Sequence, residues 1–392
     1  MHAEPFILII IRFGNIDPPS IRVTPPNSDD DIADRLHHRW TVMLLTLLVT
    51  YQEYVGDPIH CWCPAQFTDS HCNYTESLCW IQETYFVPTD ESLPTDEGNK
   101  NAKVKYYPWV PTILLFLALC YKGPNILWTL LKTANGANLY KMICRCNDCQ
   151  LGEQREVAME EVGDFLHRWL TTSKRATYGT VHTIIEKTSA CFCFCLGKRT
   201  GTYLAGLYLG VKICYLAVSI SIIFMLNKFL AIKYTFYGYE VIETLVADRE
   251  LPESPRFPTV ILCEFDIRQL QNIQRFTVQC VLSVNLYNEK IFAFLWFWFV
   301  MMMMSGLYSY IVWMRKILIP SVRFDFVNKY LGYFDKELLE KRNSTAVAKF
   351  TRDYLSTDGV FALKMIEYNT SEMVVMEIMR LLWDKSKIST KT

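Results

Sequence analysis

The segment IFAFLWFWFVMMMMSGLYSYIVWM, residues 291–314, contains no charged side chain. An α-helix rises about 1.5 Å per residue, so about 20 apolar residues cross the hydrocarbon core of a bilayer. Segments 107–131 and 202–226 are also long and apolar, whereas segment 39–56 is shorter and carries Glu53 near its end. We therefore predict an all-α membrane protein with four transmembrane helices.

The composition of the 392-residue chain favours a membrane protein, and its lack of catalytic motifs predicts that it is not an enzyme. Hydrophobic residues make up 51% of the chain, and its 40 basic and 40 acidic residues cancel. A chain without net charge offers no strong electrostatic field to nucleic acid. The sequence also lacks a glycine-rich phosphate loop, an H-E-x-x-H pair and a G-x-S-x-G elbow. We expect no catalytic residues, no cofactor, no metal site and no nucleic-acid partner.

The distribution of Lys and Arg predicts which loops face the cytosol. The loop 132–201 carries ten of these residues, and the loop 57–106 carries three. Basic residues are retained on the cytosolic side of a membrane. We therefore place 132–201 and both termini, 1–38 and 315–392, in the cytosol, and the loops 57–106 and 227–290 outside the cell.

Apolar residues at helical spacing predict that the cytosolic part is a helical dome. One amphipathic helix is expected within 132–201, and packing on neighbouring cytosolic helices is favoured over binding to the membrane surface. Its apolar positions are Val162, Phe165, Leu166, Trp169 and Leu170. A second helix is expected at 371–385, with apolar residues at Val374, Ile378, Leu381 and Leu382.

Six cysteines lie in the two loops that we place outside the cell. Four of them, Cys61, Cys63, Cys72 and Cys79, are in the first loop, and Cys263 and Cys280 are in the second. An oxidising exterior favours disulfides, and six cysteines allow 15 connectivities. Each disulfide typically contributes about 2–4 kcal/mol of stability. Rigid loops suit a docking surface. The alternative is that the disulfides only stabilise the fold of the loops outside the cell.

Several spaced motifs resemble those of innexins, the subunits of invertebrate gap-junction channels. The motif YYPWV at 106–110 is close to the family signature YYQWV, with Tyr106, Tyr107, Trp109 and Val110 at matching positions. Further motifs are PIHCW at 58–62, LCW at 78–80, TYFVP at 84–88, LCEFDIR at 262–268, RFTVQCVL at 275–282 and NEKIFAFLWFW at 288–298. The resemblance covers residues 31 to about 315. Pro108 replaces the usual glutamine, and residues 1–28 do not resemble the family's N-terminal segment, which puts their role in gating in doubt.

The resemblance implies two disulfides between the outer loops, Cys61–Cys280 and Cys79–Cys263. Cys63 and Cys72 are additional to the family pattern and could pair with each other or stay reduced. The resemblance also implies an octameric ring of identical or related innexin-like subunits around a pore. Such a ring lies among lipids in the plasma membrane at cell–cell junctions. It docks onto the hemichannel of the adjacent cell and passes ions and small metabolites.

The polar residues of the first predicted span indicate that it lines the pore. A helix with several hydroxyl and carboxylate groups is costly to surround with lipid. The residues concerned are Thr41, Thr46, Thr50, Gln52 and Glu53. Glu53 near the outer end would favour cations, unless it already lies in the headgroup region. Lys212, the charge deep in the third span, is expected to snorkel to the cytosolic interface rather than to pair or line the pore.

Two modification sites and two rival functions stay open. Cys191, Cys193 and Cys195 precede the third span and are candidates for palmitoylation, with zinc binding or inert thiols as alternatives. Asn73 lies in an Asn-Tyr-Thr glycosylation sequon, and a glycan there would hinder docking and leave a non-junctional hemichannel. A four-span adhesion or scaffold protein of the tetraspanin or claudin kind would pass no current.

Overall fold

The computed structural model describes most of the chain as two compact units. The described residues are 29–53, 58–87, 103–104, 106–133, 136, 138–148, 154–175, 201–230, 234–246, 257–269, 271–334 and 344–389. Of these, unit 1 holds Thr41–Cys120 and Val218–Met303, and the remainder belong to unit 2. Each unit is described by itself below.

Three helices in the described part of the chain are long and apolar enough to cross a membrane. They contain α5 (Val110–Lys132), α9 (Tyr203–Phe229) and α11 (Ser283–Leu318). All three overlap predicted spans. Helix α11 begins eight residues before the predicted start at 291, since its first two turns contain polar residues that the apolar pattern did not include. Pro108 lies in the 3₁₀ turn Tyr107–Trp109, where a helix start does not need its missing N–H.

The first predicted span, 39–56, corresponds to a shorter helix. Helix α3 (Thr41–Glu53) has 13 residues and is not among the three long apolar helices. It follows α2 (Ile32–Arg35) and a π-helical turn at Leu36–Trp40 without a break. Asp31 caps the start of α2, where its carboxylate accepts a hydrogen bond from the Asp34 N–H at 2.9 Å.

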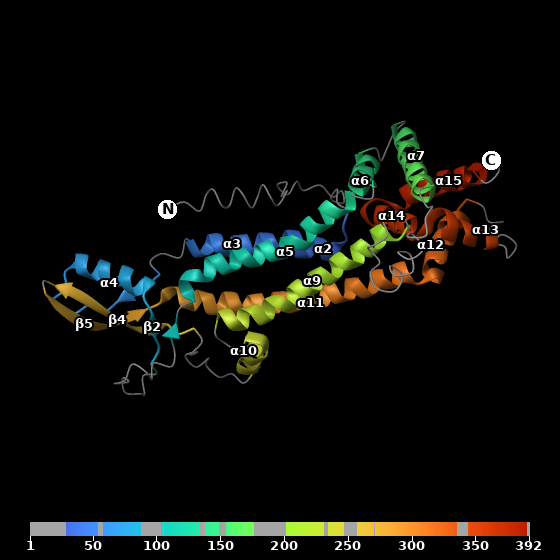
Figure 1. Ribbon diagram of the computed structural model, residues 1–392. Coiled ribbons are helices and arrows are strands. Elements are labelled where there is room, and N and C mark those ends of the chain that lie inside the picture. Colours follow the sequence, from blue (N-terminus) through green and yellow to red (C-terminus); the bar gives the residue numbers. More distant parts are fainter. Residues whose placement is uncertain are drawn as a thin grey trace, which may run out of the picture. The chain divides into compact units, whose positions relative to one another are not determined.

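Unit 1 contains a five-stranded antiparallel sheet that the all-α prediction did not anticipate. Its order is β1-β5-β4-β2-β3. The strands are β1 (His60–Cys61), β2 (Thr84–Tyr85), β3 (Lys103–Val104), β4 (Val260–Gln269) and β5 (Asn272–Val281). β4 and β5 pair along their whole length as a hairpin (Figure 1). The sheet forms because β-branched and aromatic residues alternate between a buried and an open face here, as Ile261, Cys263 and Phe265 show.

Two further helical segments of unit 1 lie between strands of the sheet in chain order. Helix α4 (Asp69–Ile81) precedes β2 and packs against β4. It buries Cys79 and Thr75, while the opposite face stays open. A 3₁₀ turn at Tyr234–Phe236 leads into α10 (Tyr237–Val246), which precedes β4. The predicted outer loops are therefore ordered by local secondary structure over most of their described residues.

Unit 2 gathers short helices around one apolar core. They are α6 (Leu139–Asp148), α7 (Gln154–Arg175), α12 (Pro320–Gly332), α13 (Ser344–Lys349), a π-helical turn at Phe350–Leu355, α14 (Ser356–Asn369) and α15 (Glu372–Ser389). The predicted amphipathic helix is confirmed as α7, whose Val162, Leu166 and Leu170 are buried in this core. Its partner is α15, which contributes Val374, Ile378 and Leu382.

Gly163 allows α7 and α15 to approach closely. A Cβ atom at this position would lie 3.2 Å from the Cδ1 atom of Leu381. Such a contact is tighter than packed side chains normally allow, so a larger residue at this position would require the Leu381 side chain to shift. Leu381 was expected among the apolar positions of its helix, and the structure assigns it to this contact.

A carboxylate from α14 caps the start of α9. The Asp358 carboxylate accepts a hydrogen bond from the Ala205 N–H at 3.0 Å, and the Asp358 N–H donates to the Gly201 carbonyl at 2.8 Å. Burial raises the pKa of Asp358 to about 6, against the lowering effect of the N–H groups it accepts from. The cap ties α14 to the helix that begins after the predicted cytosolic loop.

Candidate functional site

Two disulfides join the halves of the chain within unit 1. Cys61 of β1 lies opposite Cys280 of β5 in the strand register, with their Cα atoms 4.0 Å apart, and the two form a disulfide. Cys79 of α4 is bonded to Cys263 of β4, with Cα atoms 5.7 Å apart. The sulfur atoms of Cys61, Cys79 and Cys280 lie within 4.8 Å of one another. These are the two pairs that the family resemblance implies, and they sit side by side.

The two additional cysteines form a third disulfide. Cys63 and Cys72 are bonded, with Cα atoms 6.0 Å apart, and the two positions are only 9 apart in sequence. The bond joins the segment after β1 to the first turn of α4. Sequence reasoning left these two thiols open, because spacing alone does not distinguish a short disulfide from two reduced cysteines.

The tyrosines of the YYPWV motif connect the start of α5 to neighbouring elements of unit 1. The Tyr107 hydroxyl donates to the carbonyl of the disulfide-bonded Cys79 at 3.2 Å. The Tyr106 hydroxyl donates to the Asn285 side-chain oxygen in the first turn of α11 at 3.2 Å. Val110 is buried beside them. The motif thus positions the disulfide-bearing helix relative to α5.

Tyr107→Phe is expected to lower the free energy of unfolding by about 1 kcal/mol, because the buried Cys79 carbonyl loses a hydrogen-bond donor. Thermal unfolding of the purified protein in detergent measures the change. Tyr239→Phe is the matched control, because Tyr239 lies exposed on α10. Equal melting temperatures for the two variants would contradict the structural role of the Tyr107 hydroxyl.

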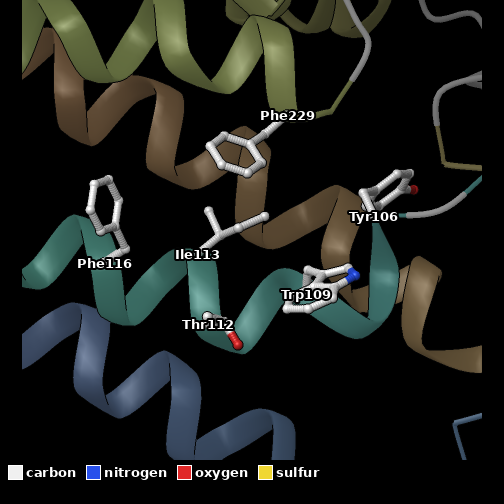
Figure 2. A pocket seen from close by; sticks show the side chains of 6 residues that line it. All are labelled: Tyr106, Trp109, Thr112, Ile113, Phe116 and Phe229. Atoms are coloured by element: carbon white, nitrogen blue, oxygen red, sulfur yellow. The ribbon is translucent and has the colours of Figure 1, made fainter.

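Trp109 differs from the other motif residues because it is 63% exposed. It borders an apolar groove of about 520 Å³, which is also lined by Tyr106, Thr112, Ile113, Phe116 and Phe229. Figure 2 shows the Ile113 side chain extending toward the ring of Phe229, with Phe116 further along α5 and Trp109 near its start. An indole at the end of an apolar helix is typical of the interface between a bilayer and water.

The hydroxyl groups predicted to line a pore lie along α3. The Thr46 hydroxyl donates to the Val42 carbonyl at 2.9 Å, and the Thr50 hydroxyl donates to the Thr46 carbonyl at 3.0 Å. Both side chains are partly exposed. Glu53 ends the helix, and its side chain, like that of Gln52, lies outside the described residues.

Thr41 does not belong to this hydroxyl-bearing face. The residue is 0% exposed, and its hydroxyl donates to the Met302 sulfur at 3.5 Å. The same hydroxyl accepts a hydrogen bond from the Trp298 indole at 3.1 Å. The prediction that Thr41 lines the pore is therefore wrong, because the residue packs against α11.

Lys212 lies in a buried charge network of unit 2. The side chain is only 2% exposed, and its ammonium is 2.7 Å from an Asp31 oxygen and 2.9 Å from an Asp34 oxygen. It also donates to the Ser309 hydroxyl at 2.7 Å. The prediction that Lys212 snorkels to the interface is wrong. A side chain surrounded by two carboxylates gains more from pairing than from extending toward water.

The two carboxylates next to Lys212 differ in their tendency to hold a proton. Burial acts to raise the pKa of Asp31, but the Lys212 charge and hydrogen bonds from Lys212 and Ser309 lower it to about 2. Burial raises the pKa of Asp34 to about 7, and the attraction of Lys212 and the repulsion of Asp31 act on it in opposite directions. The triad therefore holds one firm ion pair and a second carboxylate that takes up a proton more readily than an exposed aspartate does.

Neighbouring side chains supply the remaining hydrogen bonds of the triad. The indole of Trp313 donates to Asp31 at 2.6 Å, and the Ser309 hydroxyl donates to the same carboxylate at 2.6 Å. The Tyr208 hydroxyl donates to Asp34 at 2.8 Å. Because each carboxylate is bonded from several directions, the triad satisfies the condition under which buried charges are tolerated.

Two more acidic residues of the same segment are paired in unit 2. Asp29 accepts from the Lys132 ammonium at 2.6 Å and from the Trp128 indole at 3.2 Å. Asp30 lies 3.2 Å from a ring nitrogen of His38. Burial, together with the charges of Lys122 and Arg39, lowers the pKa of His38 to about 3, so this imidazole stays neutral. The acidic stretch before α3 is therefore a set of buried partners for α5, α9 and α11.

Sequence reasoning treated this acidic stretch only as the start of the family resemblance. A signal for its role was present, because a lone lysine within an apolar span needs an acidic partner somewhere in the chain. Asp31 and Lys212 are separated by 181 positions, and no local pattern connects them.

The modification candidates have different outcomes. Asn73 is exposed on α4, while Thr75 of the same sequon is buried and donates to the His71 carbonyl at 2.9 Å. The palmitoylation candidates Cys191, Cys193 and Cys195 lie outside the described residues. Glycosylation and palmitoylation therefore stay predictions.

Comparison with known proteins identifies the family. Residues 30–386 match the sequence profile of the innexin family. The chain belongs to the innexin family. The resemblance that the motifs indicate is thereby confirmed, and residues 1–29 lie outside the match.

Individual innexins match over nearly the whole chain. Innexin unc-9 of Caenorhabditis elegans is 35% identical over 362 residues, covering 91% of this chain and 92% of that protein. Innexin-19 of Caenorhabditis briggsae is 32% identical over 384 residues, covering 91% and 86%. Innexin-11 of Caenorhabditis elegans is 31% identical over 373 residues, covering 92% and 79%. The disulfides, the motif tyrosines and the buried triad of this innexin all fall within the matched range.

Proposed function

We propose that this innexin is a gap-junction channel subunit that passes ions and small metabolites between adjacent cells. Its site of action is the plasma membrane at cell–cell junctions. The observation that carries the proposal is the family match over residues 30–386. Three apolar helices and the disulfide-linked segments of unit 1 support it. The chain acts as a channel and not as an enzyme.

The proposed topology has four spans with both termini in the cytosol. Helix α3, together with the residues around it in segment 39–56, forms the first of these spans. Its exposed residues Met43, Leu47 and Tyr51 support contact with lipid or with other subunits. The ten Lys and Arg residues of 132–201 support a cytosolic middle loop. The helices of unit 2 then make up a cytosolic dome, and the disulfides lie outside the cell.

The proposed assembly is an octameric ring of identical or related innexin subunits, surrounded by membrane lipids. A ring in one cell docks onto a ring in the adjacent cell. The three disulfides of unit 1 support docking, because they restrict the outer segments that would have to meet a partner. A preorganised surface loses less conformational entropy on binding.

Pairs of cells that express the chain test the function. Each cell is voltage-clamped separately, and junctional current is compared with the current across single-cell membranes. Junctional current supports the proposal. Protein at the surface of both cells without current in either configuration would favour an adhesion or scaffold protein.

The pore is proposed to be lined by α3, with Thr46, Thr50 and Glu53 on the lining face. Thr50→Cys channels are expected to lose most of their current when treated with a charged, membrane-impermeant thiol reagent, because the reagent would narrow the pore. Thr41→Cys is the matched control, since Thr41 is buried against α11. The wild-type chain, treated in the same way, reports any reaction of native cysteines. Equal inhibition of the two variants would exclude α3 as the pore lining.

A non-junctional hemichannel is the second candidate function. The exposed side chain of Asn73 favours it, because a glycan on α4 would hinder docking. Asn73→Gln tests this candidate: a faster gel mobility and an increase in junctional current would support it. Unchanged mobility would show that the site is unmodified.

Palmitoylation of Cys191, Cys193 and Cys195 is proposed separately. Thioester-specific labelling of the wild-type chain and of a variant with all three cysteines replaced by serine tests it: the label should be lost in the variant.

A further inference from the structure

Three basic side chains meet in unit 2 where α11 ends. Lys316 lies in the last turn of α11, Arg323 in the first turns of α12, and Lys364 in α14. The Lys364 ammonium donates to the Lys316 carbonyl at 3.4 Å and lies 5.0 Å from the centre of the Phe326 ring. Lys364 is only 6% exposed, whereas Lys316 and Arg323 are partly exposed. The group therefore extends from the interior to the surface.

The positive charges of this group are only partly compensated. Within the described ranges, no ion pair involves Lys316, Arg323 or Lys364. Glu367 acts favourably on Lys316 and Lys364 from a distance, and its own carboxylate accepts from the Tyr330 hydroxyl at 2.5 Å. Burial and the repulsion of Lys316 lower the pKa of Lys364 to about 8. Asp31 also acts favourably on Lys316. Three cations with no carboxylate in an ion pair with them among the described residues favour the binding of an anion.

Arg323 provides a second and independent indication. One of its terminal nitrogens donates to the Thr357 hydroxyl at 2.5 Å. Its Nε atom is buried and has no hydrogen-bond partner among the described residues. Leaving a buried charged donor without an acceptor is costly, and the described residues supply none for this Nε atom, so Arg323 is suited to an added acceptor.

The start of α12 adds positive potential to the same place. The helix runs from Pro320 to Gly332, and its N-cap residue Ile319 offers no side-chain hydrogen bond to the first turn. Pro320 has no N–H and the Arg323 N–H donates to the Ile319 carbonyl at 3.3 Å, so the positive end of the helix dipole is the feature of this helix start that attracts an anion. Simple structural roles account for two of the three cations. A cation near the last carbonyl groups of α11, as Lys364 is, stabilises that helix end, and the Lys316 ammonium lies 4.8 Å from the centre of the Trp313 ring and 5.1 Å from that of Tyr368. They do not account for the buried Nε atom of Arg323.

We propose that Lys316, Arg323 and Lys364 form a binding site for a phosphate group with two negative charges, as in an inositol phosphate. The guanidinium of Arg323 and the ammonium groups suit the oxygens of a phosphomonoester. α11 is a candidate membrane span and ends at Leu318, two residues after Lys316. A phosphoinositide headgroup in the inner leaflet and a soluble inositol phosphate carry the same chemistry. The lipid source depends on the proposed topology, whereas the site itself does not.

The test uses the full-length protein in phosphatidylcholine nanodiscs. Calorimetry measures the binding of inositol 1,4,5-trisphosphate, and a second set of nanodiscs contains phosphatidylinositol 4,5-bisphosphate or phosphatidylserine. Arg323→Gln and Lys316→Met are each expected to weaken binding about tenfold or more, because each removes a charged contact. Lys329→Met is the control, because Lys329 lies on the same helix α12 but pairs with Glu372 at 2.9 Å.

Each result has a definite meaning. Binding of the trisphosphate that is lost in Arg323→Gln and kept in Lys329→Met supports the site with a soluble ligand. Binding confined to the bisphosphate nanodiscs, with the same pattern of loss, supports the site with a lipid ligand. The absence of binding to both probes, or an equal loss in all three variants, would overturn the proposal. Binding is measured without channel current, so failure here is distinct from failure of the proposed channel function.

Discussion

Replacing Lys212 with methionine is expected to destabilise unit 2 by about 3–5 kcal/mol, because it leaves buried carboxylates without their cation. The ammonium contacts Asp31 at 2.7 Å and Asp34 at 2.9 Å, and the lysine is almost fully buried. The firm ion pair with Asp31 is the main loss, while Asp34 can respond by taking up a proton. Fluorescence-detected size exclusion after heating steps measures the fall in melting temperature.

A matched control separates charge burial from the loss of any lysine in the same helix. Lys228 lies exposed near the end of α9, and Lys228→Met is expected to melt close to the wild type. The triple variant Lys212→Met with Asp31→Asn and Asp34→Asn removes the unpaired charges and is expected to recover part of the loss. A Lys212→Met protein as stable as Lys228→Met would show that the triad contributes no stability.

Removing the Cys61–Cys280 disulfide is expected to abolish junctional current and to lower the stability of unit 1 by about 2–4 kcal/mol. The bond joins positions 219 residues apart in sequence, and it ties β1 to β5 at the edge of the sheet. Loss of this link frees the segment that carries β1 from the β4–β5 hairpin. The double variant Cys61→Ser with Cys280→Ser is compared with the wild type by thermal unfolding and by paired-cell recording.

The third disulfide provides the control for this prediction. Cys63 and Cys72 are only 9 residues apart in sequence, so opening their bond releases a much smaller loop. Cys63→Ser with Cys72→Ser is expected to keep most of the junctional current. Surface biotinylation checks that both variants reach the membrane. If the two double variants behave alike, the long-range disulfide has no special role in docking.

Local composition is sufficient to identify the helices that are long and apolar enough to cross a membrane, and also the amphipathic helices of this chain. A bilayer imposes its requirement on every 20 or so consecutive residues, so α5, α9 and α11 are visible as apolar runs. Burial of one helix face imposes a repeat of 3.6 residues, which is why α7 and α15 were predicted. The β4–β5 hairpin was also encoded locally, in the alternation of LCEFDIR and RFTVQCVL, but was assigned only to a loop.

The pairing of distant residues is a different kind of information. Six outer cysteines allow 15 connectivities, and only the family resemblance selected two pairs before the structure placed Cys61 opposite Cys280. Lys212 was assigned to the interface because its partners are 181 and 178 positions away, at Asp31 and Asp34. Thr41 was assigned to the pore because its polarity is visible in the sequence and its contact with α11 is not.

The sequence alone therefore determined that this protein is an innexin-like membrane chain, with apolar helices, cysteine-bearing loops and a helical region after the last span. These properties depend on composition and short-range periodicity, which folding does not change. The tertiary structure determined which charges are neutralised, which cysteines are bonded and which threonine is buried. Those properties depend on contacts between segments far apart in sequence. The free energy of such a contact belongs to the pair, so the sequence of one segment does not identify its partner.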